Sequence, residues 1–316
     1  MKKILFATTA LVATAGVASA EIAITGSAEI GILGGDGLSA IAGAYGNNTQ
    51  FHTDIDVNFS MSGTADNGLT FGASVDLDEN GAFSNTTQGG ETYFIASGPF
   101  KLSMGDTDGA FDAALTEIGI GGSIDDAHTT HAGYNGNSGL DGTYDGQIAT
   151  ASYSASGFTG YLSVEIDDTG TGDAVYGLGF KYAANMAGLD LSVGLGYQTT
   201  DTNGGAAGGD IDIWGISLAT TFSNGLQAIL NYSDRDAAGV STTYTGIGLG
   251  YSMNALTIGV NYGEFDTAGA TTNGYGLAVN YDLGGGLVAQ FGYGAEDLAG
   301  PGGTSDQWSM GLAMSF

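Results

Sequence analysis

The stretch that decides the fold is Gln307–Phe316, which reads QWSMGLAMSF. Bulky apolar residues take every second position, from Trp308 through Met310 to Phe316, and small or polar residues take the positions between them. Because successive side chains of a strand point to opposite faces, this segment is a strand with one apolar face. Its two aromatic residues mark the ends of that face. The tilted strand between them would cover roughly 20 Å, close to the apolar height of a β-barrel in a membrane. The aromatic last residue, Phe316, is also typical of such barrels.

The first twenty residues have the pattern of a secretory signal. Lys2 and Lys3 precede an apolar run, and the small residues Ala18–Ala20 come directly before Glu21. A transmembrane anchor is the alternative, but the apolar run is too short and too rich in Ala and Thr for a spanning helix. The sequence therefore predicts that residues 1–20 are cleaved and that residues 21–316 form one exported domain.

The charge balance excludes several classes of partner. The whole chain of 316 residues has 34 acidic residues and five Lys or Arg, of which Lys2 and Lys3 belong to the predicted signal. The mature chain then has three cationic and 34 acidic residues, hence a net charge of −31, which argues against nucleic acid as a partner. With 42% hydrophobic and 12% charged residues, the chain is not an acidic disordered segment, and with no Cys it has no thiol chemistry.

The alternation seen at the end of the chain recurs from Glu21 onward in segments of about ten residues, the length of a tilted membrane strand. It is cleanest over residues 51–62. Short turns such as Asp66–Gly68 alternate with long breaks that are rich in Gly and acidic residues. The pattern predicts an all-β protein, a transmembrane antiparallel β-barrel of 16 strands with eight long loops and seven short turns. The long breaks are 34–49, 79–90, 107–145, 167–173, 199–210, 234–240, 266–272 and 295–305.

Aromatic residues give an independent indication of the same architecture, because they gather on the apolar face at both ends of the strands. A β-sandwich, the soluble alternative, would place its aromatic residues in mid-strand, whereas two aromatic girdles are typical of the two interfaces of a membrane. Beside the short turns lie Tyr153, Phe158, Tyr182, Phe222, Tyr251, Tyr281 and Phe316, and beside the long breaks lie Tyr197, Tyr232, Tyr262, Tyr275, Tyr293 and Trp308.

Several segments resemble one known family. Val57–Thr64 with Gly68–Ser74, Leu102–Asp106 and Tyr281–Gly286 resemble segments of Gram-negative general diffusion porins, in particular the trimeric porins of purple non-sulfur bacteria and related alphaproteobacteria. The resemblance implies a 16-stranded homotrimer in the outer membrane of a Gram-negative bacterium. It also implies passive passage of ions and small hydrophilic solutes, and a third loop that folds inward to narrow the pore.

The residues themselves also single out the third loop. Residues 107–145 form the longest break, and a structureless stretch of that length in a compact protein is usually functional. We expect it to fold inward and form the constriction. The alternative is a flap on the outer surface. The acidic residues expected in the constriction are Asp112, Glu117, Asp125 and Asp126.

The inward-facing charges predict the selectivity of the pore. The resemblance implies a basic wall opposite the acidic loop, but the inward positions of the first two strands hold Glu29, Asp54 and Asp56 instead. Carboxylates on both sides of a narrow pore attract cations and repel anions, so we expect a cation-selective channel. The residues expected to line the pore are Glu29, Asp54, Asp56, Asp76, Asp78, Glu165, Lys101, Lys181 and Arg235.

Other chemistry finds little support. His128 and His131 have the spacing of a metal half-site, yet the third histidine, His52, lies on a distant strand, and a solvated loop explains the pair better. No nucleophile motif accompanies these histidines, so we expect no enzyme. Asp106 and Asp108 are candidate ligands of a calcium ion, a site that the family resemblance makes plausible. No other cofactor is expected.

Two alternatives to a channel have some support in the composition. A secreted calcium-binding β-roll would need glycine-rich repeats that the chain lacks. A non-conducting outer-membrane barrel with an adhesive or structural role remains the alternative. The inner face, rich in Gly, Ser, Thr, Asn and Asp and almost without basic partners, favours a water-filled lumen. The expected surroundings are thus outer-membrane lipid outside the barrel, and cations and small hydrophilic solutes inside it.

Overall fold

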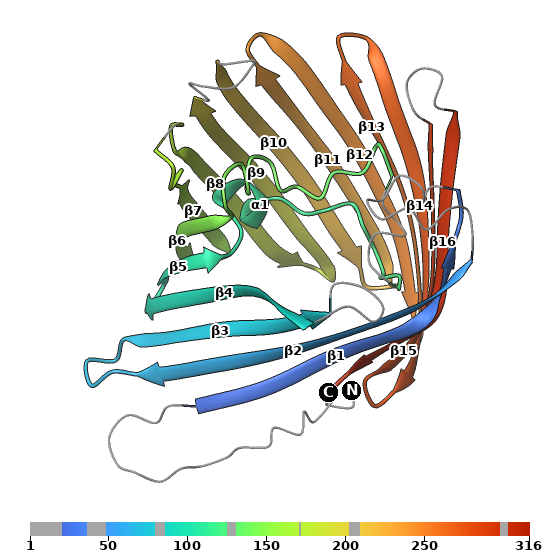
Figure 1. Cartoon of the computed structure of the whole chain (residues 1–316), viewed down its shortest axis with the longest axis horizontal. Helices are drawn as coiled ribbons and strands as arrows, with labels where there is room; N and C mark the ends of the chain where they lie inside the picture. The colour runs from blue at the N-terminus through green and yellow to red at the C-terminus, as the bar shows by residue number, and fades with distance from the viewer. Residues whose placement is uncertain are drawn as a thin grey trace.

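The computed structural model describes residues 21–36, 49–79, 86–124, 131–170, 172–201, 209–297 and 303–316. They form a closed barrel of 16 strands in which every strand pairs with its neighbour in the chain and β1 pairs with β16, all antiparallel (Figure 1). This confirms the predicted all-β barrel and its strand number. The predicted signal, residues 1–20, lies outside the described residues, as do Asp125, Asp126 and His128.

The strands differ in length, and those of the second half are the more uniform. They are β1 (Glu21–Gly34), β2 (Gln50–Thr64), β3 (Thr70–Glu79), β4 (Thr86–Ser97), β5 (Phe100–Asp106), β6 (Gln147–Ala155), β7 (Phe158–Glu165), β8 (Val175–Met186), β9 (Leu189–Asp201), β10 (Asp210–Phe222), β11 (Leu226–Ala237), β12 (Val240–Met253), β13 (Leu256–Thr267), β14 (Ala270–Gly284), β15 (Leu287–Asp297) and β16 (Thr304–Ser315).

The outer face of the barrel is apolar, as the alternation predicts. In the closing pair, Ile32 of β1 lies opposite Met310 of β16 and Ile30 lies opposite Leu312. Large apolar side chains such as Phe51, Leu230 and Met310 are exposed on the outer face, which in a soluble protein would be costly. A lipid surface removes that cost. No helix in the described part of the chain is long and apolar enough to cross a membrane.

The aromatic side chains stack in cross-strand pairs near both ends of the strands. The ring centroids of Phe158 and Tyr182 lie 4.4 Å apart beside short turns. Those of Tyr275 and Tyr293 lie 6.2 Å apart toward the other end of the strands. Such pairs stabilise neighbouring strands beyond the area they bury, by about 0.5–1.5 kcal/mol each. This arrangement agrees with the two predicted girdles.

Two of the predicted long breaks are instead tight hairpins. Residues 234–240 and 266–272 belong mostly to strands, which reverse at Ala238–Gly239 and at Ala268–Gly269. All four turn residues have positive φ angles between 53° and 86°, as a two-residue hairpin turn of the primed type requires. The apolar alternation stops before these turns because the strands continue beyond the apolar band, while their backbone pairing does not depend on apolar side chains.

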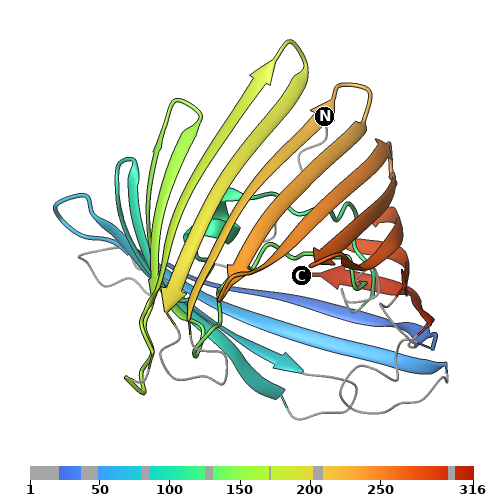
Figure 2. The ribbon, with the colours of Figure 1, turned by 90° about the horizontal axis from the view of Figure 1, so that it is seen from above.

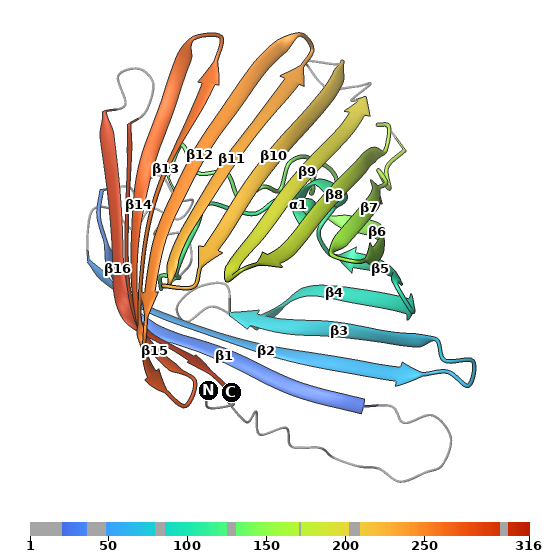
Figure 3. The same ribbon diagram turned by 180° about the vertical axis from the view of Figure 1, so that it is seen from behind.

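The connection between β5 and β6 lies inside the barrel. It contains α1 (Ala110–Ala114), which contacts β7, β8 and β9. The strands enclose α1 and the segments that follow it in three views (Figures 1, 2 and 3). The inward-folded third loop predicted from the sequence is thus confirmed.

Candidate functional site: the inward loop and the acidic wall

The loop has an apolar underside that packs on the inner wall. Phe111 and Leu115 form a buried cluster with Leu140 of the same loop and with Val175 and Ile213 of the wall. A second cluster joins Ile118 and Ile120 of the loop to Ile229 and Tyr244 of the wall. From Thr116 to Gly121 the side chains alternate as in a strand, so that Ile118 and Ile120 are buried while Glu117 is exposed. This stretch therefore presents Glu117, and not its apolar side chains, to the open lumen.

Rows of glycine on the wall make this close packing fit. Gly179, Gly196 and Gly215 lie side by side on β8, β9 and β10, and Phe111 packs on Gly196 and Gly215. A Cβ atom added to Gly196 would lie 2.7 Å from Phe111 Cδ2 and 3.0 Å from Phe111 Cα. Glycine is required here because any side chain would occupy the space of the loop. Other wall glycines against the described loop are Gly31, Gly177, Gly194, Gly246, Gly248, Gly250, Gly259, Gly263, Gly274, Gly292 and Gly311.

Strands β1, β2 and β3 carry a group of acidic side chains, called here the acidic wall, which consists of Glu29, Asp54, Asp56, Asp76 and Asp78. The register places Glu29 opposite Asp54, and Asp56 opposite Asp78. The carboxylates of Asp54, Asp56 and Asp78 offer oxygen atoms that all lie within 4.8 Å of one another. Asp76 lies opposite Asn58 and accepts the Gly90 N–H at 2.8 Å. Four predicted pore-lining acids thus share one face of β2 and β3, and Glu29 joins them from β1.

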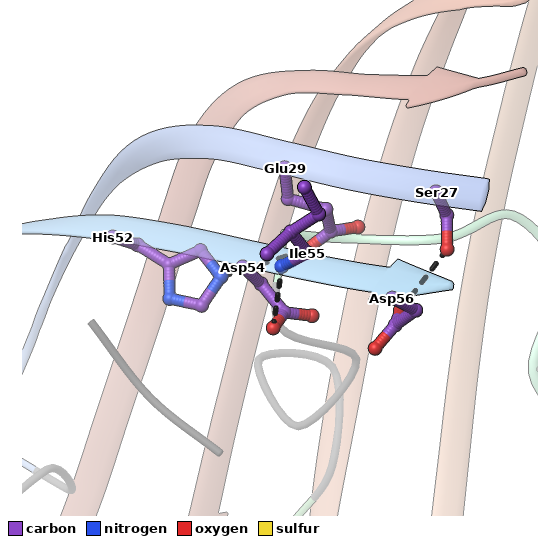
Figure 4. A network of polar contacts seen from close by, with 6 residues as sticks. All are labelled: Ser27, Glu29, His52, Asp54, Ile55 and Asp56. Carbon is purple, nitrogen blue, oxygen red and sulfur yellow. Dashed lines mark hydrogen bonds and ion pairs between the residues drawn. The ribbon is translucent and has the colours of Figure 1, made fainter. Parts of the chain in front are cut away.

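Short contacts within the wall orient these groups (Figure 4). Ser27 donates its hydroxyl to Asp56 at 3.0 Å, and the Ile55 N–H donates to Asp54 at 2.9 Å. His52 Nε2 lies 3.6 Å from the carboxylate of Glu29. The wall is therefore acidic with a histidine at its edge, where the family resemblance implied basic residues.

Lys101, Lys181 and Arg235 lie apart from this wall. Lys101 on β5 is placed over the ring of Phe94, 5.5 Å from its centroid. Lys181 on β8 lies under the loop, 3.5 Å from the carbonyl oxygen of Ala113. Arg235 lies near the C-terminal end of β11, after the buried residues Asn231 and Ser233. No basic face opposite the loop arises from these positions.

Glu165, which was predicted to line the pore, is buried against the loop. Its side chain is 2% exposed, and Oε1 accepts the backbone N–H groups of Tyr144 at 3.1 Å and Gly146 at 3.0 Å. Asp106 and Asp108, predicted as calcium ligands, are exposed and do not combine with a third His or carboxylate among the described residues. Among the described residues, the carboxylates that could together hold a cation are those of Asp54, Asp56 and Asp78.

Three loop groups have shifted pKa values. Burial, assisted by the charges of Asp108, Asp141 and Glu117, raises the pKa of Asp112 to about 7. Burial also raises the pKa of Asp141 to about 6, against the hydrogen bonds that it accepts from Gly109 and Gln198. Burial lowers the pKa of His131, whose Nε2 lies 2.8 Å from Asn261 Oδ1, so the imidazole is neutral at pH 7.

Two features of the site are not among the sequence-based predictions. The glycine rows were readable as Gly at alternate inward positions, for example Gly194 and Gly196 on β9. The buried amides that hold the loop, Gln198, Asn231, Asn261 and Asn280, gave no comparable signal, because polar residues are ordinary on an inner barrel face.

Comparisons with known proteins agree with this geometry. A model of the family described as Gram-negative porin matches residues 7–300. The Porin of Rhodobacter capsulatus is 29% identical over 189 residues, which are 58% of this chain and 57% of that protein, so the match spans little more than half of this curated relative. Mutants of the porin of Rhodopseudomonas blastica have TM-scores of 0.68 and 0.66 at 21% identity, covering 93% of this chain and 100% of theirs. At this identity the structural likeness concerns the fold alone.

Proposed function

This chain belongs to the Gram-negative porin family, and on that premise we propose that it is a passive diffusion channel with a preference for cations. Its location is the outer membrane of a Gram-negative bacterium. Ions and small hydrophilic solutes would cross the water-filled lumen that a barrel of 16 strands encloses. We also propose that residues 1–20 are removed on export, and that three copies assemble, as the family resemblance implies.

The observation that carries the cation preference is the group formed by Asp54, Asp56 and Asp78. Two carboxylates 4.8 Å apart repel each other by about 0.9 kcal/mol in bulk water and about 3.5 kcal/mol at an effective dielectric constant of 20. A cation that passes beside the group lowers this repulsion, whereas an anion adds to it. The wall therefore favours cations along the path on its side of the lumen.

The loop contributes carboxylates from the other side. Glu117 is exposed to the lumen, and Asp112 is half-buried on α1. Acidic groups on two sides of a water-filled pore act as acidic rings do in cation channels. Their effect should weaken in concentrated salt, because the Debye length falls from ~10 Å at 0.1 M to ~3 Å at 1 M.

The test is the reversal potential of single channels in a planar bilayer with a gradient of dilute KCl. We expect the reversal potential to lie close to the equilibrium potential of potassium. In the double variant Asp54→Asn and Asp56→Asn it should move toward zero. Asp66→Asn is the matched control, because Asp66 lies in the turn between β2 and β3, outside the acidic group. Chloride permeating as readily as potassium would refute the cation preference. Refolded β-sheet protein without any conductance steps would favour a surface or adhesive role instead.

A further inference from the structure

Four buried amide side chains of the wall contact the loop. Gln198 on β9, Asn231 on β11, Asn261 on β13 and Asn280 on β14 face inward and are each at most 9% exposed. They come from four separate strands, so they hold the loop at several points along its course. Each forms a hydrogen bond with a loop residue.

The amide of Asn280 pairs with the loop as a neighbouring strand would. Its Oδ1 accepts the Gly122 N–H at 2.9 Å, and its Nδ2 donates to the Gly122 carbonyl at 2.8 Å. Gln198 accepts the Leu140 N–H at 2.7 Å, and its Nε2 donates to the side-chain carboxylate of Asp141 at 2.5 Å. A primary amide has both a donor and an acceptor, so one side chain can satisfy both polar groups of a backbone segment that has no strand partner.

Asn231 joins two parts of the loop that are distant in sequence. Its Nδ2 donates to the Thr116 carbonyl at 3.0 Å and to Asn137 Oδ1 at 2.7 Å. The Thr116 N–H donates in turn to Ser217 Oγ at 2.9 Å. The outgoing and returning segments of the loop are thus fastened to each other and to the wall at one place.

These contacts and the apolar packing have different consequences. Apolar contact with the glycine rows is non-directional: it resists lifting of the loop from the wall, but it does not fix the loop at one position along the wall. Hydrogen bonds have a preferred length and angle, and a buried partner left unsatisfied costs about 1–3 kcal/mol. The barrel closes through its own strand pairing, so loss of these bonds should release the loop and leave the barrel intact.

We propose that Asn231 and Asn280, with Gln198, are positioning residues that hold the loop at one register on the wall and so set the cross-section of the pore. The loop is then a fixed constriction, and no displacement of it opens or closes the channel. This inference rests on the proposed channel function, because it assigns the residues that define the size of that channel.

The test compares the double variant Asn231→Leu and Asn280→Leu with the control Asn185→Leu. Asn185 is an inward amide of β8 that donates to Asp190 and forms no hydrogen bond with the described part of the loop, so its loss changes wall polarity without releasing the loop. In single-channel recordings we expect the double variant to show a severalfold rise in open-channel current noise and additional conductance levels. The control should keep the steady current of the unmodified protein.

Hydrogen exchange provides a readout that does not need conduction. In detergent, the amides of residues 115–124 should exchange at least tenfold faster in the double variant, while those of β9 to β14 and the thermal unfolding of the barrel stay unchanged. Wild-type noise with wild-type exchange in the double variant would overturn the proposal. Faster exchange throughout the barrel with a lower melting temperature would overturn it as well, because the amides would then be general stabilising residues. If no variant conducts but the loop exchange responds as described, the channel function fails and the positioning role stands.

Discussion

Replacement of Gly196 by alanine should push the loop toward the pore axis. The new Cβ would lie 2.7 Å from Phe111 Cδ2 and 3.0 Å from Phe111 Cα, whereas ordinary contact begins at 3.4 Å. The loop must therefore move by about 0.7 Å, because carbon atoms this close repel strongly. Phe111 is fully buried and cannot rotate into free space. The strand is the less yielding partner, since Gly196 pairs with Gly179 on one side and Gly215 on the other.

The expected cost in stability is modest, about 1–3 kcal/mol for overpacking a fitted contact. The expected functional effect is a lower single-channel conductance, and Gly196→Val should lower it further because it adds two more methyl groups. The conductance is best measured in 1 M KCl, where a Debye length of ~3 Å suppresses effects of charge and the current reports width.

Gly160→Ala is the matched control for this experiment. Gly160 also lies within a strand, but a Cβ atom there would have its nearest neighbour, Phe180, at 3.7 Å, an ordinary contact. If Gly196→Ala and Gly196→Val both conduct like the control while the barrel remains folded, then the contact between Phe111 and the glycine row does not set the width of the pore.

Four further predictions concern the charges of the loop, the charges of the acidic wall and the length of the loop. Because the pKa of Asp112 is about 7 and that of Asp141 about 6, cation selectivity should fall as the pH is lowered from 8 to 5, and Asp112→Asn should remove the upper part of this change in a reversal-potential titration. The same two raised pKa values mean that the ionised carboxyls destabilise the packed loop. The protection of the loop amides against hydrogen exchange, relative to an unstructured chain at the same pH, should therefore increase as the pH falls from 7 to about 4. A decrease in this protection over the same range would contradict the argument. Millimolar calcium should lower the potassium current in dilute salt by occupying the group of Asp54, Asp56 and Asp78, and the variant Asp54→Asn with Asp56→Asn should lose this sensitivity, as current measured against calcium concentration would show. Deletion of about ten residues within 107–145 should raise the conductance without preventing assembly, and an unchanged conductance would mean that the loop does not limit the pore.

The sequence alone determined the architecture, because strand alternation is a local signal of period two. Gln307–Phe316 and residues 51–62 show which face meets lipid, and the closed barrel of the structure agrees with them. The same parity predicts that Asp54, Asp56 and Asp78 face inward, and in the structure their carboxylates lie together. Strand ends were less predictable, as Ala238–Gly239 shows, because backbone pairing continues where the apolar pattern has ended.

Only the tertiary structure decided how the interior is organised. Parity turns Asp56 and Asp78 inward, but the register between β2 and β3 places them opposite each other. Asn280 and Gly122 are 158 positions apart, and the sequence around neither residue predicts the two hydrogen bonds between them. Contacts of this kind depend on where a loop without regular structure lies on a wall that is already closed. The local sequence determines which residues face inward, whereas the three-dimensional path of the loop determines which of them it contacts.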